Sequence, residues 1–338
     1  MTPDDVLILA WLVLAHLVAD FLLQTDGVVA DKLGDGRRAM RGLTVHGAGV
    51  ALCLTPFAAA FGARGLALLV VVTAGHVVID WWKTRATRAA EARAEGGGAR
   101  GREGDSETPE ALGAGWTPLP AVLFLLDQVF HAVLIGAAWF VFLARAEPAP
   151  EWTALVERAV GGLPQTEVHR VALLAAVLGS LLIVNVRAGA FFVATLVRPR
   201  GEGSERAIAP VEPPPPEAEL PAAWRLRLGP LEAIAQPSRV PRSPVAPVVA
   251  QRAVGHASPV RIGATIGVLE RLLIVIFVLS GAVAAIGFVV AAKTLARFKQ
   301  LDDRDFAEYY LLGTLASVAI GLASALLAQA VLATLPAS

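Results

Sequence analysis

Long apolar runs alternate with short polar or basic connections along this chain. Each run approaches the roughly 20 apolar residues that a helix needs to cross the hydrocarbon core of a bilayer. The runs that predict membrane-spanning helices are 6–23, 43–61, 66–82, 119–143, 266–292 and 309–335. A further helix is predicted from about Val171, with an interruption at Asn185, Arg187 and Gly189 and an interfacial continuation to Val197. The pattern therefore predicts an all-α polytopic membrane protein with seven crossings.

Composition changes between these runs and divides the chain into parts. Residues 1–145 form the predicted four-helix transmembrane domain, and 146–197 form a periplasmic loop followed by the fifth helix. Two segments are predicted to be disordered: 84–115, which is rich in Gly, Arg and Glu, and 198–261, which holds 13 of the 22 prolines. Residues 262–338 are predicted to be a C-terminal module of two transmembrane helices, so that about three helices follow the four-helix bundle.

Basic residues mark the connections that should face the cytoplasm. The two basic connections, after the first and the third predicted helix, contain Lys32, Arg37, Arg38, Arg41, Lys83, Arg85, Arg88 and Arg93. The connection between the second and third helices has only Arg64. By the positive-inside bias, the N-terminus is therefore expected outside. With seven crossings, however, the basic residues between 293 and 304 would also lie outside, which conflicts with this bias.

Overall composition limits the possible partners. Apolar residues make up 55% of the chain and the net charge is zero, so a membrane lipid is an expected partner and a nucleic acid is not. Cys53 is the only cysteine, which excludes an internal disulfide and a thiolate-rich metal cage. Nothing in the composition indicates a particular protein partner.

Three histidine–aspartate pairs, each spaced by four residues, lie inside the predicted helices. The pairs are His16 with Asp20, His76 with Asp80, and Asp127 with His131. A further histidine, His46, lies in the second predicted helix, which contains no pair. Four residues make about one helical turn, so both members of a pair share one helix face. Ionisable groups at membrane depth are costly and usually mark a functional site.

The order within the pairs places them at one depth. Histidine precedes aspartate in the two helices that run toward the cytoplasm, whereas Asp127 precedes His131 in the helix that returns. Each aspartate is therefore expected nearer the cytoplasm, with its histidine about 6 Å deeper. We expect the seven groups to form one site near the cytoplasmic side of the bundle.

Imidazole and carboxylate ligands without thiolates suit a divalent metal. Zinc is the metal we favour, with manganese or iron as alternatives. The histidines are the predicted metal ligands, and Asp20, Asp80 and Asp127 are the predicted catalytic groups, which would ligate, orient a histidine or act as a general base. Two other interpretations stay open: the pairs could hold the helices together, or they could form a path for protons or ions.

These spaced polar positions resemble a known family. The residues that carry the resemblance are His16, Asp20, Phe21, Gln24, Lys32, His46, His76, Asp80, Lys83, Phe124, Asp127, Gln128 and His131. They are similar to the bacterial membrane family catalogued as domain of unknown function 3307, over about residues 6–143. The resemblance implies a bacterial inner-membrane protein without an established activity. The layout is also similar, more loosely, to membrane-bound metal-dependent hydrolases.

Together these observations predict a metal-dependent membrane hydrolase or lipid-modifying enzyme. Gln24, Lys32, Lys83 and Gln128 are the predicted substrate-binding residues, and the two lysines could attract a phosphate. As an alternative, these lysines are ordinary basic anchors at the membrane surface. A transporter or proton relay, and a scaffold without catalysis, are the alternative functions. In the C-terminal module, Glu270 and Glu308 are expected to pair with Arg271, Lys293 or Arg297.

Overall fold

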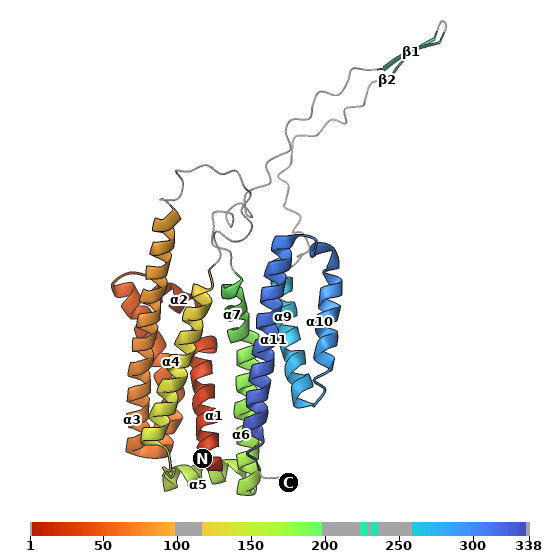
Figure 1. Ribbon diagram of the computed structural model, residues 1–338. Coiled ribbons are helices and arrows are strands. Elements are labelled where there is room, and N and C mark those ends of the chain that lie inside the picture. Colours follow the sequence, from red (N-terminus) through yellow and green to blue (C-terminus); the bar gives the residue numbers. More distant parts are fainter. Residues whose placement is uncertain (1, 99–116, 198–223, 229–230, 236–258, 336–338) are drawn as a thin grey trace. The chain divides into compact units, whose positions relative to one another are not determined.

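The computed structural model describes residues 2–98, 117–197, 224–228, 231–235 and 259–335. The chain divides into two compact units. One comprises Met1–Pro199 and Gly263–Ser338, and the other comprises Arg200–Ile262. In the first unit, every element is helical. The predicted all-α class is therefore confirmed for this unit, whose helices are shown in Figure 1.

The first predicted crossing ends in a widened turn. Helix α1 (Pro3–Val18) begins at a capping box, in which Thr2 and Asp5 each accept a hydrogen bond from the other's backbone N–H. It continues into a π-helical turn, η1 (Ala19–Leu23), and the short helix α2 (Asp26–Lys32) follows. The π-helical turn places Asp20 where the helix is locally widened, a geometry often found at functional sites.

The second and third predicted crossings form one helical hairpin. Element α3 (Arg37–Gly98) has non-helical backbone at Gly62, with φ of 55° and ψ of −129°. The two arms run antiparallel and are in close contact near the turn. A Cβ atom added to Gly65 would lie only 2.0 Å from the carbonyl oxygen of Phe57. The second arm continues as helix to Gly98, so the prediction that 84–98 is disordered was wrong. Alanine, arginine and glutamate are good helix formers, and the helix simply extends beyond the apolar run. Residues 99–115 of that prediction lie outside the described residues.

Helices α4 to α7 complete the N-terminal part of the unit. Helix α4 (Leu119–Phe142) packs against α3, and helix α5 (Pro150–Val160) lies in what was predicted to be a plain loop. Helix α6 (Gln165–Ile183), the π-helical turn η2 (Val184–Ala188) and helix α7 (Gly189–Leu196) form one uninterrupted helical span. The predicted break at Asn185 was therefore wrong. The π-helical turn accommodates the polar residues without ending the helix.

The sixth predicted crossing is broken. Helix α9 (Pro259–Leu279) ends at a turn that includes Gly281, and helix α10 (Ala285–Ala296) runs back along it. Lys293 Nζ lies 2.7 Å from Glu270 Oε2, which holds the two helices antiparallel. The single helix predicted over 266–292, and the two-helix module built on it, were wrong because a positive φ at Gly281 reverses the chain.

This reversal resolves the charge conflict noted in the sequence. After the 3₁₀ turn η3 (Phe298–Gln300), helix α11 (Arg304–Leu332) runs antiparallel to the α6–α7 span: Gly313 lies near Val197, and Ser324 bonds Asn185. The basic residues at 293–304 therefore lie at the end of the bundle where α7 ends and α4 begins (Figure 1).

The second unit contains a two-stranded antiparallel sheet. Strand β1 (Trp224–Leu228) pairs with β2 (Leu231–Ala235), with Trp224 opposite Ala235 and Leu228 opposite Leu231. The prediction of disorder was therefore wrong for these ten positions. Apolar and basic residues alternate in Trp224–Leu228, and a Gly–Pro pair follows; this pattern is typical of a hairpin. The other residues of 198–258 lie outside the described residues.

Within the part of the chain that the structure describes, five helical segments are long and apolar enough to cross a membrane. They are Asp4–Leu23, Arg37–Ala89, Leu119–Phe142, Gln165–Leu196 and Phe306–Leu332, and the second of them is the folded-back α3. Two apolar cores join them. One contains Leu12, Leu54 and Leu68 from α1 and α3, and the other contains Leu173 and Ile274 from α6 and α9.

The turn at Gly62 gives a test of the hairpin. An L-residue at this φ and ψ is strained, so Gly62→Ala should reduce the free energy of unfolding by about 1–3 kcal/mol. The matched control is Gly136→Ala in α4, where a Cβ atom meets nothing within 4 Å and the helix propensity improves. Thermal unfolding in detergent, followed by circular dichroism, measures both variants. Equal stability of the two variants would contradict the assigned turn.

Candidate functional site

The seven ionisable residues predicted to share one site come together in the structure. They form the His/Asp cluster, which consists of His16, Asp20, His46, His76, Asp80, Asp127 and His131. Helix α1 with its π-helical turn, both arms of α3, and α4 each contribute side chains to it. His46 and His76 meet because the arms of α3 are antiparallel about Gly62. The cluster is thus assembled from three elements and one chain reversal.

Four donor atoms converge at the centre of the His/Asp cluster. His46 Nε2 lies 2.8 Å from His76 Nε2, and Asp20 Oδ1 lies 3.3 and 3.1 Å from these two nitrogens. Asp80 Oδ2 lies 3.3 Å from His46 Nε2 and 3.8 Å from His76 Nε2. The imidazoles of His46 and His76 are almost completely buried. Asp20 Oδ1 makes no hydrogen bond to a described residue despite these short separations.

The remaining members of the His/Asp cluster, His16, Asp127 and His131, lie beside this centre. The His131 ring lies 4.0 Å from the His76 ring and 4.9 Å from the His16 ring, measured between centroids. His131 Nδ1 lies 2.9 Å from the backbone oxygen of Asp127, which fixes the ring on its own helix. Among the described residues, His131 Nε2 and His16 Nδ1 have no hydrogen-bond partner. Because the other nitrogen of each ring faces an oxygen acceptor, these two nitrogens carry a free lone pair in the neutral imidazoles.

Two lysines neutralise two of the three carboxylates. Lys32 Nζ contacts Asp80 Oδ2 and donates to Gln24 Oε1 at 2.9 Å, and Lys83 Nζ lies 2.6 Å from Asp127 Oδ2. The Lys32 side chain is only 7% exposed, so its interpretation as a surface anchor was wrong. Helix α2 packs against α3 and brings this lysine inward. Lys83 is 30% exposed and lies at the edge of the site.

Gln128 links the edge of the site to its interior. Its Nε2 donates to Asp127 Oδ2 at 3.0 Å, and its Oε1 lies 3.4 Å from His16 Nε2. The four residues predicted to bind substrate thus all contact the His/Asp cluster or its lysines. Substrate binding itself stays a prediction.

Asp20 is the carboxylate without a lysine. No described lysine or arginine lies within 4 Å of it, and its neighbours are the imidazoles of His16, His46 and His76. A buried carboxylate needs a compensating positive charge. A protonated imidazole or a bound cation at the centre of the cluster would supply that charge.

The bundle on the deeper side of the His/Asp cluster is apolar. On the side of the cluster that faces the turn at Gly62 there is a void of about 10 Å³. Its wall includes Leu12, Leu54, Val72 and Ile135 together with His16 and His76. A space this small and apolar is too poor in polar partners to hold a chain of water molecules. Within the described residues, the site is therefore closed on this side.

A second buried polar group lies in the C-terminal module, and its partners were not foreseen. Arg271 Nε donates to the backbone oxygen of Asn185 at 2.7 Å, and Nη1 donates to Ser317 Oγ at 3.2 Å. The π-helical turn η2 exposes the carbonyl group that this guanidinium needs. The predicted pairing of Glu270 with Lys293 is confirmed, whereas Glu308 contacts Arg304 instead of the predicted partners.

The Lys32–Asp80 pair allows a test of charge compensation. Lys32→Met should reduce the free energy of unfolding by about 3–5 kcal/mol in the presence of a chelator, because it leaves Asp80 buried without its lysine. Arg38→Met is the matched control, since it removes an exposed partner of Asp31 and should change stability by no more than about 1 kcal/mol. Denaturant titration in detergent compares the two. Similar losses for both variants would show that burial of the pair is unimportant.

Comparison with known proteins finds one family that matches part of the chain. The searches of curated proteins and of solved structures each found no match. Residues 8–158, which include every residue of the His/Asp cluster, match the family described as "Protein of unknown function (DUF3307)".

Proposed function

We propose that the protein is a metal-dependent membrane hydrolase or lipid-modifying enzyme whose ion is held by Asp20, His46 and His76. The observation that carries this proposal is the triangle formed by their three donor atoms, with sides of 2.8, 3.1 and 3.3 Å. Two imidazoles and one carboxylate are a ligand set that catalytic zinc sites use.

The dimensions of this triangle fit a zinc ion. Zinc bonds of roughly 2.0–2.2 Å at tetrahedral angles place neighbouring donor atoms about 3.3–3.6 Å apart. Two of the three sides are within a few tenths of an ångström of that range. The two imidazole nitrogens need to separate by roughly half an ångström. Manganese or iron would use the same ligands with a larger coordination number.

Charge also favours a cation at this position. Asp20 is the carboxylate that lacks a lysine, and it forms one corner of the triangle. A divalent ion would compensate its charge and would need no buried imidazolium. Lys32 can stay on Asp80 Oδ2, because a carboxylate oxygen accepts more than one partner.

Asp80 has the position expected of a general base. Its Oδ2 lies 3.3 Å from His46 Nε2 and 3.8 Å from His76 Nε2, next to two of the three proposed ligands. When bound, the zinc ion polarises a substrate oxygen and activates water for hydrolysis. Asp80 would accept the proton, and Lys32 would keep this carboxylate oriented. His131, whose ring packs at a tilt against that of His76, would hold the ligand ring in place.

The substrate class follows from the depth of the site. Lys83 and Gln128 lie at its more exposed edge, and Lys83 begins one of the two basic connections. By the positive-inside bias this edge is cytoplasmic, which supports an N-terminus outside and a bacterial inner-membrane location. A phospholipid or another ester at the inner leaflet would reach this edge.

The alternative functions use the same residues differently. A proton relay would need polar groups on both sides of the His/Asp cluster, and the apolar packing at Leu12, Leu54 and Ile135 argues against one. A scaffold would use the cluster only to hold the helices together. It would require a buried imidazolium beside Asp20 in place of the ion.

Metal content tests the ligand assignment. The full chain, purified in detergent without chelators, should hold one zinc ion, and His76→Ala should weaken zinc binding more than about 100-fold, since even residues that only support ligands contribute 10–100-fold. His169→Ala, outside the cluster, is the matched control and should keep the ion. Elemental analysis and competition with a zinc indicator measure both. A metal-free wild type, or equal metal in both variants, would rule out this site.

Hydrolysis tests the reaction separately from the metal. In vesicles of mixed bacterial phospholipids, the zinc-loaded protein should release a headgroup or fatty acid detectable by mass spectrometry. Asp80→Asn should keep zinc and slow release by about 10²–10⁴-fold, as expected for loss of a general base. Asp31→Asn, which is paired only at the surface, should keep full activity.

Two results would reject the enzymatic proposal while leaving the metal site intact. One is a zinc-loaded protein that releases no product from these lipids. The other is proton or ion flux across the vesicle membrane that is lost in Asp80→Asn, which would instead establish a relay.

A further inference from the structure

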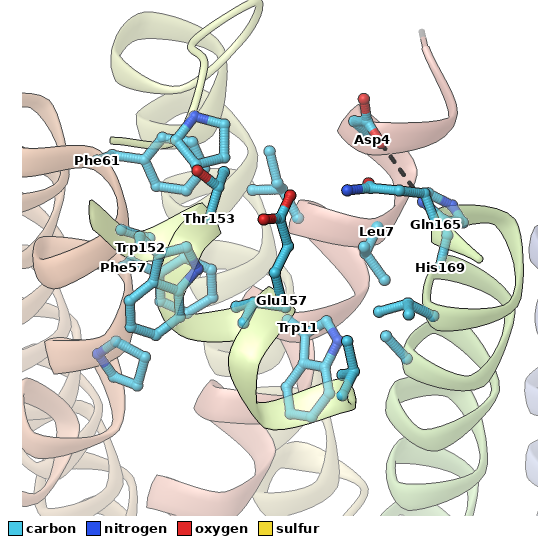
Figure 2. Close-up of a pocket in the computed structure, with 18 of the residues that line it drawn as sticks. Asp4, Leu7, Trp11, Phe57, Phe61, Trp152, Thr153, Glu157, Gln165 and His169 are labelled. Atoms are coloured by element: carbon cyan, nitrogen blue, oxygen red, sulfur yellow. Dashed lines mark ion pairs between the residues drawn. The ribbon is translucent and has the colours of Figure 1, made fainter. Parts of the chain in front are cut away.

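A second site runs along α1 from the end of this helix that is opposite the His/Asp cluster. It is a cavity of about 690 Å³ between α1, the first arm of α3, α5 and α6, called here the α5 cavity. Its volume is within the range of ligand-binding pockets, and aromatic side chains form much of its wall. Figure 2 shows Trp11, Phe57, Phe61 and Trp152 around it.

Helix α5 forms one wall through a single face. Trp152, Val156 and Val160, spaced by four residues, line the α5 cavity, whereas Leu155 is exposed and lies outside the lining. The helix is attached to the bundle where Ala149 N donates to the oxygen of Ala60 at 2.7 Å. No residue of α5 is fully buried. Such an amphipathic helix covers an apolar space without filling it.

The length of the α5 cavity matches a lipid chain. On α1 its lining extends from Asp4 to Val18, which is about 21 Å at the rise of an α-helix. One leaflet contributes about half of the roughly 30 Å hydrocarbon core. The cavity lies along a membrane-spanning helix, so hydrocarbon is the solvent next to it. The space along α1 is therefore longer than the hydrocarbon of one leaflet and is long enough for an extended acyl chain.

Polar groups gather at the outer end of the α5 cavity only. Figure 2 shows Asp4, Thr153, Glu157, Gln165 and His169 around this rim, with Asp4 Oδ1 3.4 Å from His169 Nδ1. Among the described residues, no hydrogen bond or ion pair engages the carboxylate of Glu157, which comes from α5 and is exposed. The rim carries two carboxylates and one imidazole. It therefore suits a headgroup that bears a positive charge.

We propose that the α5 cavity binds one membrane phospholipid, with an acyl chain along α1 and an amine-bearing headgroup at Glu157. Phosphatidylethanolamine has this chemistry, because its ammonium group can pair with Glu157 and donate to Thr153. An anionic lipid such as phosphatidylglycerol lacks the amine and is repelled by Asp4 and Glu157. The proposal does not depend on metal in the His/Asp cluster, because no residue of that cluster lines the α5 cavity.

Native mass spectrometry of the full chain in mild detergent tests this proposal. With equal amounts of phosphatidylethanolamine and phosphatidylglycerol of the same chain length, one lipid should stay bound. The ethanolamine lipid should be preferred about fivefold, as expected for one partly exposed ion pair. Glu157→Gln should abolish this preference, whereas Glu151→Gln, on the same helix but outside the lining, should keep it.

Filling the α5 cavity tests the position of the acyl chain. Val156→Trp should reduce bound lipid of both kinds, because the indole occupies the space of the chain, and Ala172→Leu fills it less drastically from α6. The matched control Leu155→Trp adds the same side chain on the exposed face of α5 and should retain lipid. Circular dichroism verifies that each variant is folded.

Three results would overturn the proposal. The first is a wild type that retains no lipid, and the second is equal lipid loss in Val156→Trp and Leu155→Trp. The third is equal binding of the ethanolamine and glycerol lipids by the wild type, which would remove the role assigned to Glu157.

Discussion

Burial of three carboxylates inside a bundle of apolar helices is the constraint on which this structure depends. Asp80 and Asp127 are each paired with a lysine, and these lysines come from α2 and from the second arm of α3. Asp20 is surrounded by imidazoles instead. A low-dielectric interior tolerates such charges only when partners are held in place. Helix α2 supplies the lysine for Asp80, and the π-helical turn that follows α1 carries Asp20.

The fold-back at Gly62 converts one long helix into the core of the site. It sets the two arms of α3 so that His46 faces His76, and α4 then adds Asp127 and His131 from a third direction. The apolar layer around Leu54 and Leu68 fills the bundle between the site and the turn. The same hairpin therefore supplies both the polar groups and the packing that closes the site on its deeper side.

The His/Asp cluster lies at the C-terminal end of α1, the α5 cavity runs along this helix, and the two sites differ in chemistry. The first gathers ligands and charges in a buried space, and the second offers a long apolar space with a polar rim. Helices α9, α10 and α11 contribute no described residue to either site. Their buried Arg271 instead bonds the carbonyl group of Asn185 at the π-helical turn, which attaches α9 to the α6–α7 span.

The sequence by itself determined the helical class, most of the apolar helices and the residues of the His/Asp cluster. These depend on local periodicity: residues four apart share a helix face, and the reversed order of Asp127 and His131 sets their depth. The sequence also carried a signal for helix after Lys83 that was overlooked, because this run is rich in good helix formers.

Only the tertiary structure decided which groups meet. The pairing of Lys32 with Asp80 depends on how α2 packs against α3, and the shape of the α5 cavity depends on where α5 lies. The reversal after α9 likewise depends on one positive φ, at Gly281, inside an otherwise apolar run. Periodicity determines the faces of single helices, whereas register, packing and chain reversals between separate helices are determined by contacts that are distant in the sequence.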